Sequence, residues 1–499
     1  MSLRSNFPAI FAVMAVLSAM NLGGQSAVSA SSMPVKTLAA LQQLAGGMLL
    51  SGQAYEYDRQ LADEIGPRLT GSTNYVKATD WAVAEFTRLG LKNVHKESWT
   101  IPAAWEPETG GSARIVEPHQ QRLHLESEGW SPSTPEGGIR GTVFYVSNLG
   151  SAEAIQKDAE KIKGAIVLVD SDSSHAAGEV TDGTFLDNGL LLAKLGAVAV
   201  LDGHGTTQNA VSVGGDVWDG HLLPLPTANV GAEDTLLLRR LLERGPVRVE
   251  FNFRNRIREN VKVDNVVAEI PGAETPQEYV LINGHLDSWH PGTGAQDDGT
   301  GVAMVVETAR AVMALNKPPR KTLRFVLFGG EEEGLLGSHA YAKAHEAELK
   351  NCAAVIVTDS GSEAPKGWMT LGRADVKAKL APLAPLLAGL GAEGTTDYGR
   401  IAFGTDEAAF VARGVPALLL WTGFDKYRAL HHKPSDTFDK VVQKDLTLGA
   451  AVVGLTAYAI ADEPEPFAAH LTTPQVEEQM KAIKMFEEYK DMRDRGFLF

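Results

Sequence analysis

Between residues 259 and 462, short apolar runs alternate with longer segments of helical spacing. The runs "EYVLIN", "TLRFVLF", "AAVIV" and "VPALLLW" have the length of strands, and "GVAMVVETARAVMAL" has the length of a helix. This alternation is typical of a mainly parallel sheet with helices on both faces. Such sheets carry their functional groups beyond the carboxyl ends of the strands. The predicted fold class is therefore α/β, with a mixed, mainly parallel sheet between helices.

Three further segments surround this α/β core. Residues 31–115 show helical spacing and then a strand, so we expect them to form the N-terminal part of the same domain. Residues 116–258 contain short β-rich runs between Gly-rich and Asp-rich turns, which predicts a small inserted domain. In the tail, residues 463–499, Thr473 is a plausible helix cap and apolar residues share one helical face. That face either docks on the body or forms a homodimer contact.

The first thirty residues have the pattern of a signal peptide. Arg4 precedes the apolar run "AIFAVMAVLSAM", and the small residues "AVSA" predict cleavage after Ala30. The apolar run is shorter than the about 20 residues that a membrane-spanning helix needs. No later segment looks apolar enough to span a membrane. We therefore expect an exported protein, periplasmic or extracellular, without a membrane span in the mature chain.

Composition narrows the possible partners and ligands. The chain has 46 Lys and Arg against 62 Asp and Glu, a net charge of −16, without a long basic run, so nucleic acid is not an expected partner. Cys352 is the only cysteine, which excludes internal disulfides and thiolate metal clusters. A metal ion would have to be held by His, Asp and Glu.

Acidic residues and histidines follow four of the apolar runs. These residues are His285 and Asp287, with Asp297 and Asp298 in the same loop, then Glu331–Glu333, then Asp359, and finally His431 and His432. Carboxylates that converge on one cleft repel each other unless cations neutralise them. The pattern therefore predicts divalent metal at the sheet edge. Oxygen and nitrogen donors without thiolate suit zinc or its neighbours.

The number of donors fits two ions better than one, because paired metals need a bridging carboxylate and further ligands on each side. Asp297 is the natural bridge between the two ions. His285 and His432 could each bind one ion, and Glu332 and Asp359 could complete the two sites.

Two more side chains have expected roles beside the metals. Asp287 lies two residues after His285 and can accept a hydrogen bond from the second ring nitrogen, which fixes the tautomer. Consecutive helical residues diverge by about 100°. Glu331 and Glu332 therefore cannot both face one ion. One can bind metal while the other accepts a proton from the attacking water.

The motifs "GHLDSW", "GAQDDGTG", "GEEEGLLGS", "VTDSG" and "HHKPSDT" resemble the co-catalytic zinc exopeptidase family. That family contains bacterial leucyl aminopeptidases and plasma glutamate carboxypeptidase, also called carboxypeptidase Q. The segment "DEIGPRLTGS" near the N-terminus also fits this group. Within residues 116–258, "KGAIVLVD" and "AKLGAVAVLD" resemble the protease-associated domain inserted in some exported exopeptidases.

The resemblance implies two Zn²⁺ ions per chain and assigns the side chains around them. It implies Glu331 as general base, Asp287 behind the first histidine, and as metal ligands His285, Asp297, Glu332, Asp359 and His432. It favours His432 over His431 as the last ligand, and it implies a cis peptide between Asp297 and Asp298. Tyr427 could support the oxyanion or simply belong to the core.

The expected function is hydrolysis of short peptides or dipeptides by an exported exopeptidase, through a hydroxide shared by two zinc ions. Which terminus is cleaved stays open. An aminopeptidase needs an acidic group for the substrate ammonium, whereas a carboxypeptidase or dipeptidase needs a cation, and Arg400, Asp406 and Glu407 offer both signs. Two alternatives are a glutaminyl cyclase with a single zinc ion and a receptor-like relative without catalysis.

Overall fold

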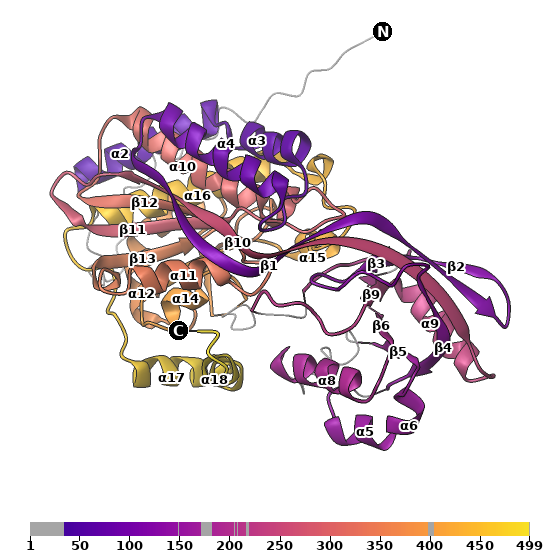
Figure 1. Cartoon of the computed structure of the whole chain (residues 1–499). Helices are drawn as coiled ribbons and strands as arrows, with labels where there is room; N and C mark the ends of the chain where they lie inside the picture. The colour runs from indigo at the N-terminus through magenta and orange to yellow at the C-terminus, as the bar shows by residue number, and fades with distance from the viewer. Residues whose placement is uncertain are drawn as a thin grey trace, which may run out of the picture.

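Two long antiparallel strands, β1 (Lys92–Glu117) and β10 (Arg248–Ile270), pass through both lobes of the molecule (Figure 1). The C-terminal end of β10 pairs with β12 in the larger lobe, and its N-terminal end pairs with β4 in the smaller one. The computed structural model describes residues 34–147, 149–170, 182–203, 205–206, 208–215, 219–397 and 404–498. The predicted signal peptide, residues 1–30, lies outside the described residues.

The larger lobe contains the predicted sheet, in the strand order β15-β14-β16-β13-β11-β12-β10. Its other strands are β11 (Thr275–His285), β12 (Lys321–Phe328), β13 (Cys352–Val357), β14 (Gly367–Met369), β15 (Gly394–Thr396) and β16 (Ala417–Trp421). Strand β11 is parallel to β12 and β13, and β13 is parallel to β16. Strands β10 and β14 are antiparallel to their neighbours β12 and β16. The prediction of a mixed, mainly parallel α/β sheet is confirmed.

Helices cover both faces of this sheet, and alternate strand residues point into the apolar cluster on one face or the other. Val280 and Ile282 of β11 lie in one apolar cluster, while Tyr279 and Leu281 lie in the other. The first cluster includes residues from α2 (Val35–Ser51), α3 (Ala54–Arg59), α4 (Thr73–Leu89), α10 (Thr300–Leu315), α12 (Ala374–Leu380), α13 (Ala384–Ala388) and α16 (Gln443–Asp462). The second includes residues from α11 (Leu336–Ala344), α14 (Ala408–Val411), α17 (Thr473–Ala482) and α18 (Phe486–Asp494).

Helix α16 is a core helix, although its composition resembles a membrane span. Among the described residues it is the one helix that is long and apolar enough to cross a bilayer. The sequence had predicted no such segment after the signal peptide. However, 72% of its most apolar window is buried inside the protein. It packs against α10 and α2, so its apolar surface belongs to the core.

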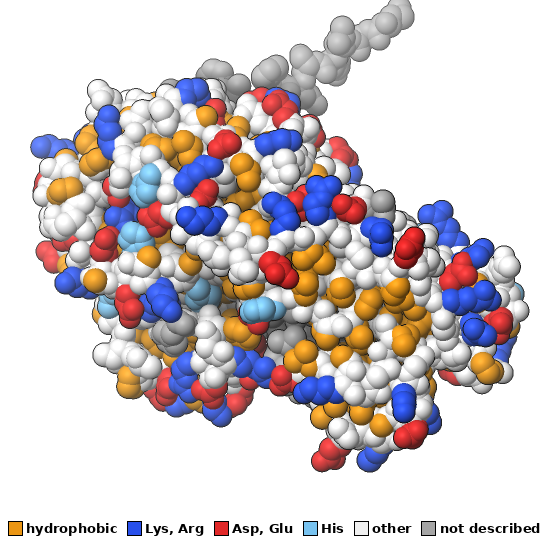
Figure 2. All heavy atoms as spheres, viewed as in Figure 1, with side chains coloured by type: hydrophobic (Ala, Val, Ile, Leu, Met, Phe, Trp, Pro, Cys, Tyr) orange, Lys and Arg blue, Asp and Glu red, His pale blue; other side chains and the backbone are white. Residues whose placement is uncertain are grey.

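The smaller lobe lies between β1 and β10 in the sequence and extends the same sheet in the order β10-β4-β5-β6-β9-β3, while two further strands pair only with each other. Its strands are β2 (Gln121–Leu123), β3 (Leu125–Ser127), β4 (Ile139–Tyr145), β5 (Ile166–Val169), β6 (Ala199–Asp202), β7 (Gly205–Thr206), β8 (Ala210–Val211) and β9 (Thr227–Val230). Its helices are α5 (Ala152–Lys157), α6 (Ala159–Ile162), α8 (Asp182–Lys194) and α9 (Ala232–Leu242). Figure 2 shows apolar side chains gathered on the viewed face of this lobe.

The predicted domain boundaries, 115/116 and 258/259, fall inside β1 and β10, because these strands run through both lobes. The division into segments 116–258 and 259–462, and the likeness to a protease-associated domain, stay predictions.

The C-terminal tail forms two helices where one continuous apolar face was expected. Helix α17 ends at Ala482, and Lys484 has a left-handed φ of 63°, so the chain turns before α18. The cap is Thr472 rather than Thr473, and its backbone N–H donates to Gln475 at 2.8 Å. Both helices contribute to the buried cluster with α11 and α14. The apolar side chains of the tail therefore pack against their own chain. Dimer formation stays a prediction.

The second aspartate of the "DDGTG" motif is a structural residue at the start of α10. Asp298 accepts hydrogen bonds from the backbone N–H of Gly301 at 3.0 Å and of His285 at 3.1 Å. It thereby satisfies a backbone donor in the first turn of α10 and ties the helix to the end of β11. A Cβ atom on Gly301 would lie only 2.1 Å from Asp298 Oδ1. The glycine is required by this close approach.

We therefore expect Gly301→Ala to destabilise the protein by about 1–3 kcal/mol through overpacking. Gly46 in α2 is the control, because a Cβ there meets nothing within 4 Å. Gly46→Ala should instead stabilise the helix by about 0.5–1 kcal/mol. Urea unfolding of both variants measures the two changes. Stabilisation by both substitutions would contradict the close packing at Gly301.

Candidate functional site

The sheet register brings the ends of four strands to one edge. His285 at the end of β11 lies beside Phe328 at the end of β12. Asn283 pairs with Val357 of β13, which in turn pairs with Leu419 of β16. Segments that follow these strands therefore begin at the same edge, as expected for a mainly parallel α/β sheet.

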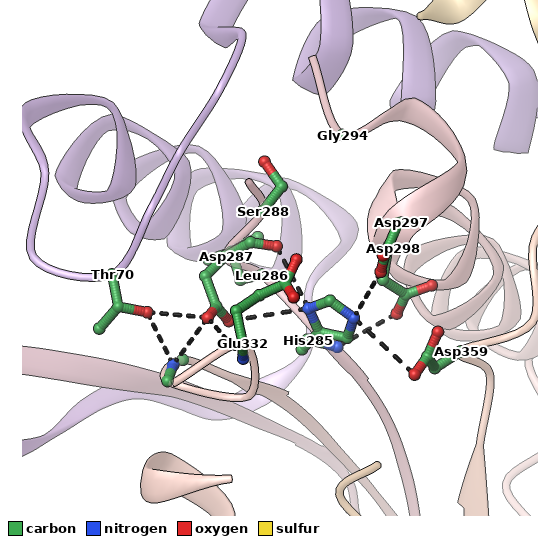
Figure 3. A network of polar contacts seen from close by, with 12 residues as sticks. Thr70, His285, Leu286, Asp287, Ser288, Gly294, Asp297, Asp298, Glu332 and Asp359 are labelled. Atoms are coloured by element: carbon green, nitrogen blue, oxygen red, sulfur yellow. Dashed lines mark hydrogen bonds and ion pairs between the residues drawn. The ribbon is translucent and has the colours of Figure 1, made fainter. Parts of the chain in front are cut away.

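All five predicted ligand residues meet in one cluster at this edge. Figure 3 shows four of them, His285, Asp297, Glu332 and Asp359. Asp297 lies at the centre of the cluster. Its Oδ1 is 3.1 Å from His285 Nε2, and its Oδ2 is 3.3 Å from His432 Nε2. His285 Nε2 is also 3.9 Å from Asp359 Oδ2, and His432 Nε2 is 2.9 Å from Glu332 Oε2. The two oxygens of Asp297 thus face two separate groups of donors.

The double histidine contributes both of its rings to this region. His431 Nε2 lies 3.4 Å from Asp297 Oδ2, and the two imidazole rings stack with centroids 3.6 Å apart. The side chain of His431 is 42% exposed, against 18% for His432. His432 contacts both Asp297 and Glu332, so it lies inside the cluster, while His431 lies at its solvent side.

Asp287 and Glu331 lie next to the donor cluster. His285 Nδ1 is 3.2 Å from the backbone oxygen of Asp287 and 3.8 Å from its carboxylate Oδ1. A proton on Nδ1 is therefore donated to the backbone oxygen, and the lone pair of Nε2 faces Asp297. Glu331 offers an oxygen within 4.8 Å of donor atoms of both His285 and Asp359.

The donor atoms are suited to a metal ion. His285 Nε2, Asp297 Oδ2 and Glu332 Oε1 are buried, and within the described residues none has a partner with good hydrogen-bond geometry; the near neighbours of the first two are other donor atoms of the cluster. Buried polar atoms are nearly always hydrogen-bonded, so three converging exceptions call for another partner. Imidazole nitrogen and carboxylate oxygen are ligands that zinc accepts in proteins. The residues present therefore fit a divalent metal.

The ionisation of the cluster shows strong mutual interaction. Burial alone would raise the pKa of Asp297, but His285, His431 and His432 hold it well below its ordinary value. Burial raises the pKa of Glu332 to about 7, with the charge of Asp297 adding to the effect. Burial acts against protonation of His432, yet Glu332 and Asp297 raise its pKa to about 10. Such opposed shifts are typical of functional sites.

The remaining predicted residues are placed as follows. The peptide between Asp297 and Asp298 is cis, as the resemblance implied. The Tyr427 hydroxyl donates to Asp359 Oδ1 at 2.8 Å, so it orients a predicted ligand. Asp406 and Glu407 are fully buried and do not face solvent. Arg400 lies outside the described residues.

Sequence reasoning missed several residues that hold this site together. Asp436, from "HHKPSDT", accepts hydrogen bonds from the backbone N–H of Gln296 at 2.7 Å and of Asp297 at 3.2 Å. The backbone N–H of Val213, from the smaller lobe, donates to the His432 carbonyl at 2.9 Å. The motif containing Asp436 was visible in the sequence, but nothing there paired Val213 with His432.

Comparisons with known proteins match this chain to peptidases. Residues 265–455 match the model of Peptidase family M28. Carboxypeptidase Q from Mus musculus is 32% identical over 416 residues, covering 83% of this chain and 86% of the relative. Aminopeptidase YwaD from Bacillus subtilis is 24% identical and covers 88% of this chain and 90% of the relative.

Solved structures of related peptidases have the same fold as this chain. A peptidase M28 precursor from Shewanella amazonensis superposes with a TM-score of 0.78 at 28% identity, covering 88% of this chain and 99% of the other. The zinc aminopeptidase BSAP from Bacillus subtilis has a TM-score of 0.63 at 21% identity, covering 84% of this chain and 98% of the other. At 21% identity the second comparison shows the fold alone. Together with the long match to carboxypeptidase Q, these findings establish that the chain belongs to peptidase family M28.

Proposed function

We propose that the chain is an exported exopeptidase that hydrolyses short peptides or dipeptides with two zinc ions. The observation that carries this proposal is the central position of Asp297, whose two oxygens face His285 and His432 separately. One carboxylate shared between two donor groups is the arrangement that paired metals require. The signal-like pattern of residues 1–30 supports export.

Each proposed zinc site has three ligands from the chain. His285, Asp297 and Asp359 would hold one ion, and Asp297, Glu332 and His432 would hold the other. When bound, the zinc ions would lower the pKa of a water molecule and polarise the scissile carbonyl. A structural relative at 21% identity, BSAP, is described as a zinc aminopeptidase. Two donor groups favour this function over a glutaminyl cyclase with one zinc ion.

Glu331 is the proposed general base. It follows β12 at the same sheet edge as the donors, and its oxygen lies near both His285 and Asp359. Neither of the two proposed three-ligand groups includes Glu331. Its carboxylate can accept the proton of the attacking water and pass it to the departing amine.

A carboxypeptidase or dipeptidase activity is favoured over an aminopeptidase activity. The relatives with 30–32% identity are carboxypeptidases Q, whereas the aminopeptidase YwaD is 24% identical. We therefore propose that a free carboxyl terminus on the substrate is the feature required.

Glu331→Gln should lower kcat by about 10²- to 10⁴-fold, because the amide cannot accept the proton. The zinc content should stay at two ions per chain, since Glu331 is outside both donor groups. Steady-state hydrolysis and elemental analysis of the same sample measure the two effects. Asp297→Asn is the contrasting variant, expected to lose zinc together with activity. Near-normal turnover by Glu331→Gln would exclude its role as base.

Chelation should remove activity, and two equivalents of zinc should restore it. We expect the restored enzyme to cleave free and N-blocked dipeptides but to leave C-amidated dipeptides intact. Product analysis after equal incubation with the three substrates measures this preference. Cleavage of the C-amidated peptide together with resistance of the N-blocked one would instead indicate an aminopeptidase.

A further inference from the structure

We propose that Thr70 is a positioning residue of the active site, and that its hydroxyl holds the His285 loop and the Glu331 loop at a fixed separation. Thr70 belongs to the motif "GPRLTGS", far from both loops in the sequence. The inference depends on the proposed function, because it concerns the geometry of the same metal centre.

The Thr70 hydroxyl makes hydrogen bonds to both loops. The side chain is completely buried, and Oγ1 donates to Asp287 Oδ2 at 2.9 Å. The same oxygen accepts the backbone N–H of Gly330 at 2.8 Å. Figure 3 shows Thr70 and His285 on opposite sides of Asp287. One hydroxyl therefore connects the carboxylate beside the first histidine to the residue just before Glu331.

Asp287 completes the connection between the two loops. Its Oδ2 also accepts the backbone N–H of Gly330 at 3.1 Å and of Glu332 at 3.3 Å. Its backbone oxygen lies 3.2 Å from His285 Nδ1. Donors from the Glu331 loop and the hydroxyl of Thr70 thus share one carboxylate oxygen. Outer partners of metal ligands set the orientation of those ligands, which is the role proposed for this hydroxyl.

The turn at Gly330 is closely packed, so the chain cannot shift there to make up for a lost hydrogen bond to Thr70. Its φ is +73°, and a Cβ atom there would lie 2.6 Å from the Trp99 ring. Asn265 accepts the N–H of Gly329 at 3.2 Å, so the preceding residue is also held. The path of the chain into Glu331 is therefore determined by backbone hydrogen bonds. Thr70 supplies one of their acceptors.

Arg68 shows that the same motif also holds the other end of the His285 loop. This arginine is completely buried, and its guanidinium donates to the backbone oxygens of Leu286 at 2.6 Å, Thr293 at 3.0 Å and Gly294 at 2.9 Å. The backbone of the loop between His285 and Asp297 is thus held by a side chain from a distant segment. Thr70 extends this support to the second loop, on which Glu331 and Glu332 lie.

The test compares Thr70→Val, which removes the hydroxyl at constant shape, with Thr70→Ser, which keeps it. Thr70→Val should lower kcat by about 10- to 100-fold and weaken zinc binding by a similar factor, with little change in KM. Thr70→Ser should restore both values most of the way to wild type. Zinc affinity is measured by competition with a chelating dye, independently of turnover.

Thr308→Val is the matched control, because Thr308 is completely buried and its hydroxyl has no hydrogen-bond partner in the described structure. It should leave kcat and zinc affinity unchanged. If Thr70→Val does not fold, Thr70→Ala against Thr70→Ser makes the same comparison. The proposal would be overturned if Thr70→Val kept the wild-type kcat and zinc affinity. It would also be overturned if Thr70→Ser lost as much of both as Thr70→Val. An inactive wild type would refute the proposed function instead, and zinc affinity would still test Thr70.

Discussion

Mutual repulsion of buried carboxylates is the constraint on which this structure depends. Asp297, Glu332 and Asp359 converge with two histidines on one edge of the sheet, where solvent screening is weak. Such a group is unfavourable unless positive charge lies among its members. The strand register that brings the residues together would be hard to explain if their function were purely structural.

Support for this centre comes from segments that are distant in the sequence. Arg68 and Thr70 fix the first two loops from the N-terminal segment, and Asp436 fixes the backbone around Asp297. The smaller lobe contributes as well, because Val213 holds the carbonyl of His432. Most of these contacts have a backbone group as one partner, so they set the position of whole loops. The metal centre is therefore a property of the complete fold rather than of residues 259–462 alone.

Prediction from sequence succeeded where the signal was periodic and local. The strand β11 and helix α10 follow from their apolar spacing, and the residues after the strands follow from chain order. It was less successful where two elements had to be placed against each other. The tail was expected to be one helix but turns at Lys484, and β1 and β10 cross the predicted domain boundaries. Neither feature changes the local composition that such predictions use.

The sequence by itself determined the chemistry available to this protein. A single cysteine and a set of acids and histidines after apolar strands limited the centre to hard or borderline metal ligands. Tertiary structure alone decided which oxygen of Asp297 faces which histidine, and it brought the ring of His432 to 2.9 Å from Glu332. It also joined Thr70 to Asp287 across more than two hundred residues. The reason is that donor type is a property of each residue, whereas distance and direction arise only when separate segments pack together.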